Sequence, residues 1–145
     1  MPTTAASPFP TLTLAASVHA EMVAACLAGY PLEACGLLGG HPDGESALAT
    51  ACYPAPNVAA SSRVYTVEPR AMLRADRAAE DAGLSVLGVW HSHTHTDAYP
   101  SPTDIGQAPD PDWWYVLVSL RDVEPVVRAY RIRDGAVVER PIALQ

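Results

Sequence analysis

The chain has 145 residues, of which 49% are hydrophobic and 17% are charged. This length and balance predict a single folded domain with a hydrophobic core and exclude a largely disordered chain. Nine basic and 16 acidic residues give a net charge of −7, which argues against a nucleic-acid or anionic-membrane partner bound by bulk electrostatics. The three cysteines form no close pair along the chain, unlike a secreted disulfide framework.

The N-terminus predicts no targeting segment. Residues 1–10 are expected to form a flexible tail and residues 11–145 one domain. The tail lacks the basic region of a signal peptide, and no apolar run of the chain is long enough to span a bilayer. We therefore expect a cytoplasmic protein without a membrane partner. The oligomeric state stays open, and a homodimer is compatible with the sequence.

The first half of the chain alternates helix and strand signals. Ser17 is a favourable N-cap, and Gly29 is a favourable residue to end the helix that follows. The expected elements of this half are a strand over 11–14, a helix from Ser17 to about Ala28, and strands over 34–40 and 47–53 that pair antiparallel across a turn at 41–44.

The second half begins with a second helix and a buried strand. Pro69 suits the first turn of a helix that runs to about Ala82 and is closed by Gly83. Residues 84–90 form a nearly continuous apolar run, which predicts a central strand covered on both faces. This strand is expected to deliver His91 at its C-terminal end.

The remaining elements complete a mixed α/β domain in which two helices sandwich a central sheet. They are an extended piece over 64–67, a short helix capped by Thr103, a buried strand over 115–119, and a hairpin of strands 126–132 and 137–142 that turns at Asp134-Gly135.

Metal-binding residue types follow the central strand at close spacing. His91 and His93 are one residue apart, and Asp104 lies beyond a proline-rich loop. If His91 ends the strand, both imidazoles point to the same side, because side chains alternate along a strand. Two histidine nitrogens and one aspartate oxygen leave one corner of a tetrahedral zinc site open, as in catalytic sites. This ligand set favours zinc over other divalent ions.

A hydrolytic metal site also needs a base for the attacking water and a donor for the developing oxyanion. Glu33 is the candidate base. It stands directly before the predicted buried strand 34–40, which is an unusual place for a charge unless the side chain faces a cleft.

Glu33, His91, His93, Ser101 and Asp104 agree in type, order and spacing with the motif of the JAMM (MPN+) zinc metallopeptidases, and the similarity covers most of the chain. The string from His91 to Asp104 resembles a bacterial branch, the CysO-cysteine peptidase type. That branch removes cysteine from the C-terminus of a ubiquitin-like sulfur-carrier protein. The resemblance implies a single MPN-type domain with a curved central sheet between helices, similar to cytidine deaminases.

The resemblance also implies a role for each motif residue. His91, His93 and Asp104 would bind one Zn²⁺ per chain. Glu33 would deprotonate the attacking water and pass the proton to the leaving amine, and Ser101 would donate a hydrogen bond to the oxyanion. The implied reaction is hydrolysis of the amide after the C-terminal Gly-Gly of the carrier, which releases cysteine in cysteine biosynthesis.

Two other functions are weighed against this one. The chain has no room for the long insertions with which eukaryotic members hold ubiquitin, so we expect a narrow substrate tail and a small leaving group. An isopeptidase that removes ubiquitin-like proteins from lysine conjugates is the first alternative. A non-catalytic MPN scaffold is the second, and the presence of the whole motif argues against it.

Three residues have more than one interpretation. Asn57 resembles a family asparagine that would contact the substrate backbone, or it only builds its loop. His95 continues the alternation of the histidines and could compete as a metal ligand; a residue that supports the ligands or faces the substrate is favoured, and a solvated loop residue is the next interpretation. Ser101 stands before a proline, so it is suited to a turn as well as to catalysis.

Overall fold

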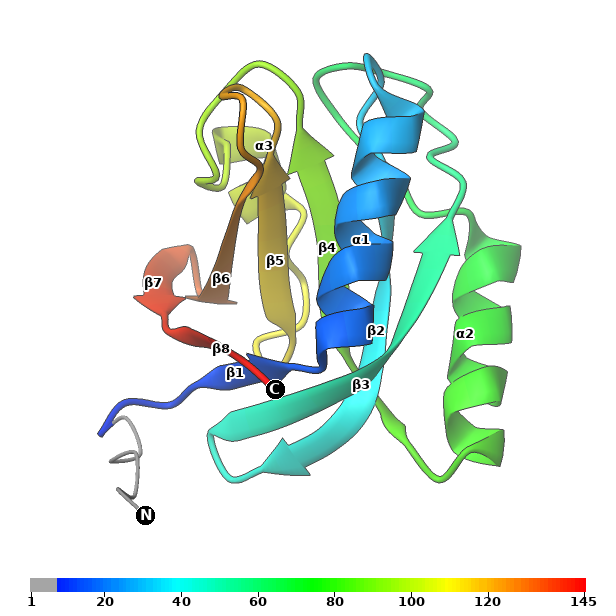
Figure 1. Ribbon diagram of the computed structural model, residues 1–145, viewed down its shortest axis with the longest axis vertical. Helices are drawn as coiled ribbons and strands as arrows, with labels where there is room; N and C mark the ends of the chain where they lie inside the picture. Colours follow the sequence, from blue (N-terminus) through cyan, green and yellow to red (C-terminus); the bar gives the residue numbers. More distant parts are fainter. Residues whose placement is uncertain (1–7) are drawn as a thin grey trace.

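All strands that the structure describes belong to one twisted sheet (Figure 1). The computed structural model describes residues 8–145, so most of the predicted tail over 1–10 lies outside the described residues. The elements are β1 (Leu12–Leu14), α1 (Ala16–Gly29), β2 (Cys35–Asp43), β3 (Ser46–Ala55), α2 (Pro69–Asp81), β4 (Ser85–His93), α3 (Pro102–Gly106), β5 (Trp114–Ser119), β6 (Val126–Arg133), β7 (Ala136–Arg140) and β8 (Ile142–Leu144).

The strand order is β7-β6-β5-β4-β2-β3-β1-β8, with β4 near the middle. β4 pairs antiparallel with β2 and parallel with β5. This arrangement confirms the predicted mixed α/β fold, and it confirms the predicted antiparallel pairing of β2 with β3. Among the described residues, no helix is long and apolar enough to cross a membrane.

Helices α1 and α2 cover opposite faces of the sheet (Figure 1). Leu38 and Trp90 belong to the core cluster that contains the buried face of α1, whereas Leu37 and Val89 belong to the cluster that contains Ala75 of α2. Neighbouring residues of a strand point to opposite faces, so β2 and β4 are buried on both sides. The predicted sandwich of a central sheet between two helices is therefore confirmed.

The start of α1 differs from the prediction. Ser17 was expected to cap the helix, but Ala15 occupies the N-cap position and no side chain caps the helix. Instead, the backbone N–H of Ala15 donates to Ala49 O at 3.0 Å, and that of Ala16 donates to Gln145 O at 2.9 Å. Carbonyl groups of neighbouring chain segments thus take the place of a capping side chain.

The C-terminal strands also differ from the prediction. A hairpin partner over 137–142 was expected, but β7 ends at Arg140 and the chain leaves the hairpin at Pro141. Beyond it, β8 pairs parallel with β1 at the far edge of the sheet. Proline has no N–H to continue a ladder, which explains the break. The extended piece expected over 64–67 forms only an isolated bridge between Asn57 and Val67.

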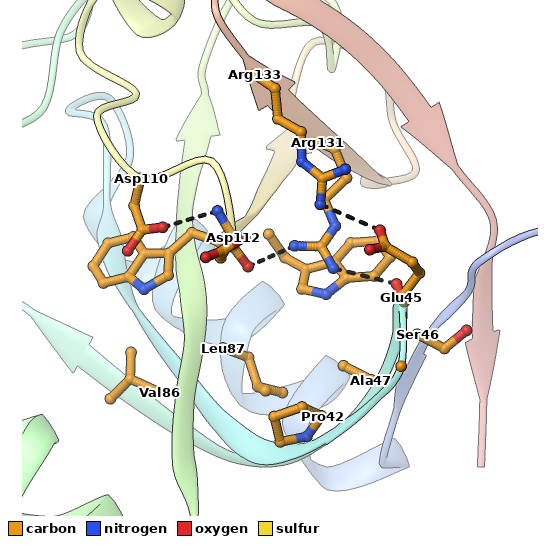
Figure 2. A pocket seen from close by; sticks show the side chains of 13 residues that line it. Pro42, Glu45, Ser46, Ala47, Val86, Leu87, Asp110, Asp112, Arg131 and Arg133 are labelled. Carbon is orange, nitrogen blue, oxygen red and sulfur yellow. Dashed lines mark hydrogen bonds and ion pairs between the residues drawn. The ribbon is translucent and has the colours of Figure 1, made fainter.

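A buried arginine braces the end of the sheet at which β4 starts (Figure 2). Arg131 of β6 is 8% exposed, and its guanidinium carbon lies 4.1 Å from the centroid of the Trp114 ring. Its Nη1 donates to Asp112 O at 2.6 Å and its Nη2 donates to Glu45 O at 3.2 Å. Arg131 therefore ties the β2–β3 turn to the segment before β5.

Candidate active site

Antiparallel pairing of β2 with β4 brings Glu33 to the histidines. Cys35 pairs with His91 in the ladder. One residue earlier, Ala34 N donates to Ser92 Oγ at 2.9 Å, and Ser92 N donates to Ala34 O at 2.9 Å. The predicted end of the central strand at His91 is wrong, since β4 continues through His93. The continuation fixes both imidazoles on one side of a regular strand.

Three ligand-type atoms converge at this end of β4. Nε2 of His91 lies 3.2 Å from Nε2 of His93, and Asp104 Oδ2 lies 3.2 Å from the first and 3.0 Å from the second. Nitrogen and oxygen ligands lie about 2.0–2.1 Å from zinc, so neighbouring ligands of a tetrahedral site are about 3.3–3.4 Å apart. The triangle of side-chain atoms therefore has the dimensions of one face of such a site.

The hydrogen bonds of His93 decide which of its nitrogens faces the cluster. Nδ1 lies 2.7 Å from Asp97 O, a carbonyl oxygen that only accepts, so Nδ1 carries the proton. Nε2 is thereby left to face the Asp104 carboxylate. Burial alone would lower the pKa of His93, but hydrogen bonds to Asp104 and to Asp97 O outweigh it and raise that pKa, whereas burial lowers the pKa of His91. In their neutral forms, with Nδ1 carrying the proton, both imidazoles would present Nε2 lone pairs to a metal ion.

Helix α3 holds Asp104 in place. Ser101, not Thr103 as predicted, is its N-cap: Ser101 Oγ accepts from Asp104 N at 3.1 Å, and Ser101 N donates to Asp104 Oδ2 at 2.9 Å. The reciprocal bonds form a capping box, and Pro102 suits the first helical position. Burial alone would raise the pKa of Asp104, but contacts with both imidazoles and the Ser101 N–H outweigh it and hold that pKa far below its usual range.

Glu33 has the properties expected of a general base. It is 4% exposed, and its Oε1 is buried without a hydrogen-bond partner among the described residues. Oε1 lies 4.0 Å from His91 Nε2, and ligand atoms of Glu33, His91 and His93 all lie within 4.8 Å of one another. Burial raises the pKa of Glu33 to about 7; Asp104 adds to this rise and His93 opposes it. The four side chains therefore fit a metal ion with Glu33 beside it.

A cavity of about 450 Å³ opens from Glu33 and His93 toward the solvent. His95 lines it, with Nδ1 2.8 Å from Thr94 Oγ1 and Nε2 3.5 Å from the Tyr30 hydroxyl. His95 is exposed and takes no part in the triangle of ligand atoms. This position fits a side chain that faces the substrate better than a third histidine ligand.

The side chain of Asn57 is fully engaged in its own loop. Nδ2 donates to Glu33 O at 3.0 Å and to Val64 O at 3.1 Å, whereas Oδ1 accepts from the N–H groups of Ala59 and Thr66. These four bonds use the whole capacity of an amide. The structure therefore favours the second interpretation of Asn57, a residue that builds the loop beside Glu33, over direct contact with the substrate.

Two residues near the site have no signal in the sequence. Tyr65 stacks on His91, with ring centroids 4.1 Å apart and planes at 20°, and so fixes the plane of that imidazole. Arg63 lines the cavity that contains Glu33. Both belong to the loop between β3 and α2, whose position depends on the bonds of Asn57.

Residues 15–133 match the family model described as prokaryotic homologs of the JAB domain. The chain belongs to this family. It is 42% identical to the CysO-cysteine peptidase of Mycobacterium tuberculosis over 132 residues, which cover 90% of this chain and 89% of that protein. It is also 39% identical over 90 residues to the desampylase of Haloferax volcanii, with coverage of 61% and 63%.

Solved structures agree with this assignment. The solution structure of a Desulfitobacterium hafniense protein superposes with a TM-score of 0.86 at 36% identity, covering 92% of each chain. A JAB1/MPN domain protein of Archaeoglobus fulgidus has a TM-score of 0.59 at 20% identity, covering 90% of this chain and 98% of that one, and so supports the fold alone. The JAB family is metal-dependent and hydrolytic, and this chain is accordingly a JAB-type peptidase.

Proposed function

We propose that this protein is a zinc peptidase that hydrolyses the amide after the C-terminal Gly-Gly of a ubiquitin-like sulfur-carrier protein and releases cysteine. The observation that carries the proposal is the triangle of His91, His93 and Asp104 atoms, 3.0–3.2 Å on each side, next to a carboxylate oxygen of Glu33 that has no hydrogen-bond partner within residues 8–145. The relative named CysO-cysteine peptidase supports the substrate, since its similarity extends over 90% of this chain.

His91, His93 and Asp104 would hold the zinc ion, one per chain. When bound, zinc polarises the scissile carbonyl and lowers the pKa of a water molecule that it binds. The donor set suits this ion, because two imidazoles and one carboxylate are common ligands of catalytic zinc. All three side chains are buried, and His93 lines the cavity through which water and substrate would reach the ion.

Glu33 would accept the proton of the attacking water and deliver it to the leaving amine. A pKa of about 7 suits both steps near neutral pH, because a base whose pKa is close to the ambient pH both accepts and releases a proton readily. Ser101 would stabilise the oxyanion. Its Oγ accepts from Asp104 N, which leaves the hydroxyl proton free to donate to a substrate oxygen.

The diglycine tail fits the proposal on steric grounds. Glycine has no Cβ, so a tail of two glycines lets the substrate backbone approach the walls of a narrow cleft closely. A carrier of this kind would be the protein partner, in the cytoplasm.

An isopeptidase acting on lysine conjugates is the second candidate. It is favoured by the 39% identity to the Haloferax volcanii desampylase and by 39% identity over 109 residues to a probable TtuB-protein conjugate cleaving protease of Thermus thermophilus, which cover 74% of this chain and 67% of that protein. Carrier–cysteine and carrier–lysine conjugates assayed side by side separate the two functions.

The test is hydrolysis of a carrier–cysteine adduct by the purified, zinc-loaded protein, followed by mass spectrometry. We expect Glu33→Gln to lower kcat by about 10²- to 10⁴-fold, because general-base catalysis contributes roughly this factor. Zinc content, measured by atomic emission, should stay at one ion per chain. Glu124→Gln, a change at an exposed glutamate of the β5–β6 turn, is the matched control. Full activity of Glu33→Gln, or of the protein after chelation, would contradict the mechanism.

A further inference from the structure

Arg63 provides the fixed positive charge of the cavity at the active site. The cavity is lined by Glu33, Ser62, Arg63, His93, Thr94, His95, Thr96 and Ser101. Arg63 is the sole arginine or lysine among these residues, and it lines the same cavity as Glu33, the proposed general base. Within residues 8–145 its side chain forms no hydrogen bond or ion pair, in contrast to Arg74, Arg121, Arg128 and Arg133, which all have acidic partners.

The loop that carries Arg63 is tied to both walls of the site. Glu33 N donates to Ser61 O at 2.8 Å, and Thr94 Oγ1 donates to Ser62 O at 3.3 Å. Ser61 Oγ in turn accepts from Arg63 N at 3.0 Å. The Cα of Arg63 is therefore held next to Glu33 and to the end of β4, while its guanidinium group is free to meet a ligand.

The chemistry of the proposed substrate supplies an anion at this place. In a carrier–amino acid adduct, the carbon next to the scissile nitrogen carries a free carboxylate. In a lysine isopeptide, the same nitrogen carries a methylene chain without charge. A carboxylate brought into this cavity meets the carboxyl group of Glu33 in a chain with a net charge of −7. A cation in the same cavity offsets this repulsion.

We propose that Arg63 binds the α-carboxylate of the residue that is released, and that this contact selects a free C-terminal residue over a lysine conjugate. The guanidinium fork matches a carboxylate with two parallel hydrogen bonds. The inference rests on the proposed peptidase function and adds the group that decides between its two substrate classes.

The test compares two substrates that differ in one charge: carrier–cysteine and the same adduct with a C-terminal carboxamide. We expect the wild-type protein to hydrolyse the acid with a kcat/KM about 10- to 100-fold above that of the amide, the usual range for a hydrogen-bonded charge pair. Arg63→Gln should lose this factor on the acid and keep wild-type kcat/KM on the amide. Arg63→Lys should retain part of the preference.

Arg70→Gln, a change at an exposed arginine in the first turn of α2 outside the cavity, is the matched control and should keep the wild-type preference. Binding of both adducts to the Glu33→Gln protein, measured by calorimetry, should show the same preference without turnover. Equal hydrolysis of acid and amide by the wild type would overturn the role of Arg63 and leave the proposed function standing. An equal loss on both substrates in Arg63→Gln would also overturn it. Hydrolysis of neither substrate by the wild type would overturn the proposed function, and this inference with it.

Discussion

Buried charged side chains lie near both ends of β4, three or more at one end and Arg131 at the other, and the two ends differ in how their polar atoms are paired. At the C-terminal end, ligand-type atoms of His91, His93 and Asp104 lie within 3.2 Å of one another. Near the N-terminal end, Arg131 directs two donors at carbonyl oxygens and lies over an aromatic ring (Figure 2).

Only the first group needs something that the chain does not supply. Nδ1 of His93 is used by Asp97 O, and the three ligand-type atoms converge beside Glu33 Oε1, which has no hydrogen-bond partner among the described residues. Arg131, in contrast, finds acceptors within the fold, and only its Nε lacks a partner among the described residues. A buried charge thus indicates a ligand site when metal-ligand atoms converge beside an unpaired carboxylate oxygen, and a structural brace when its groups are paired with complementary ones.

Zinc binding tests the end of β4 that carries His91 and His93, and it should have the largest effect on the free energy of unfolding. Zinc in about 1,000-fold excess over its dissociation constant should raise the free energy of unfolding by about 4 kcal/mol, because the ion binds the folded state. Denaturant unfolding with zinc and with chelator measures this increment. Asp104→Asn should remove it, whereas Asp112→Asn, beside the brace, should keep it. An unchanged midpoint in wild-type protein with added zinc would contradict the comparison.

Removing the brace should cost somewhat less and should leave the metal site intact. Arg131→Met keeps the aliphatic volume but loses two hydrogen bonds from a charged group and the contact with Trp114. We expect a loss of about 2–3 kcal/mol in the free energy of unfolding, with an unchanged zinc increment. Arg128→Met, at an exposed ion pair with Glu139, should cost under about 1 kcal/mol. A smaller zinc increment in Arg131→Met would show that the two ends are coupled.

The fold was predictable where the signals are local. The apolar run over 84–90 became part of β4, and Pro69 and Gly83 bracket α2 as expected, with Gly83 at a φ of 72°. The pairing of β8 with β1 was not predictable, because it joins residues at opposite ends of the chain. The predicted cap of α1 was wrong for the same reason, because the N–H groups at the start of the helix donate to the distant carbonyl oxygens of Ala49 and Gln145.

The site residues, too, were predictable where the signal is local and were missed where it depends on distant parts of the chain. The spacing of His91, His93 and Asp104 is a local pattern, so the sequence alone pointed to the residues that converge in the structure. Tyr65 and Arg63 reach the site only because the loop between β3 and α2 is folded back onto Glu33. That folding depends on the side-chain bonds of Asn57, one of them to Glu33 O, and on a backbone bond from Glu33 N to Ser61 O; the bonds to Glu33 join residues far apart along the chain.

In metal-free protein, the change in the free energy of unfolding with pH also distinguishes the Glu33 end of the sheet from the Arg131 end. This is the smallest of the expected effects. Burial raises the pKa of Glu33 from 4.5 to about 7 in the folded state. A carboxyl group with a raised folded-state pKa stabilises the fold while it is protonated, and this contribution is lost as pH rises through about 7. From pH 5 to pH 8 the loss amounts to roughly 2 kcal/mol. In chelator-treated protein, Glu33→Gln should therefore gain stability relative to wild type as pH rises, by about this amount. Glu124→Gln, at an exposed site, should follow the wild type at both pH values. A constant difference in the free energy of unfolding between Glu33→Gln and wild type from pH 5 to pH 8 would mean that the Glu33 carboxylate already has a compensating partner without the metal. The contrast with Arg131, whose partners lie within the fold, would then disappear.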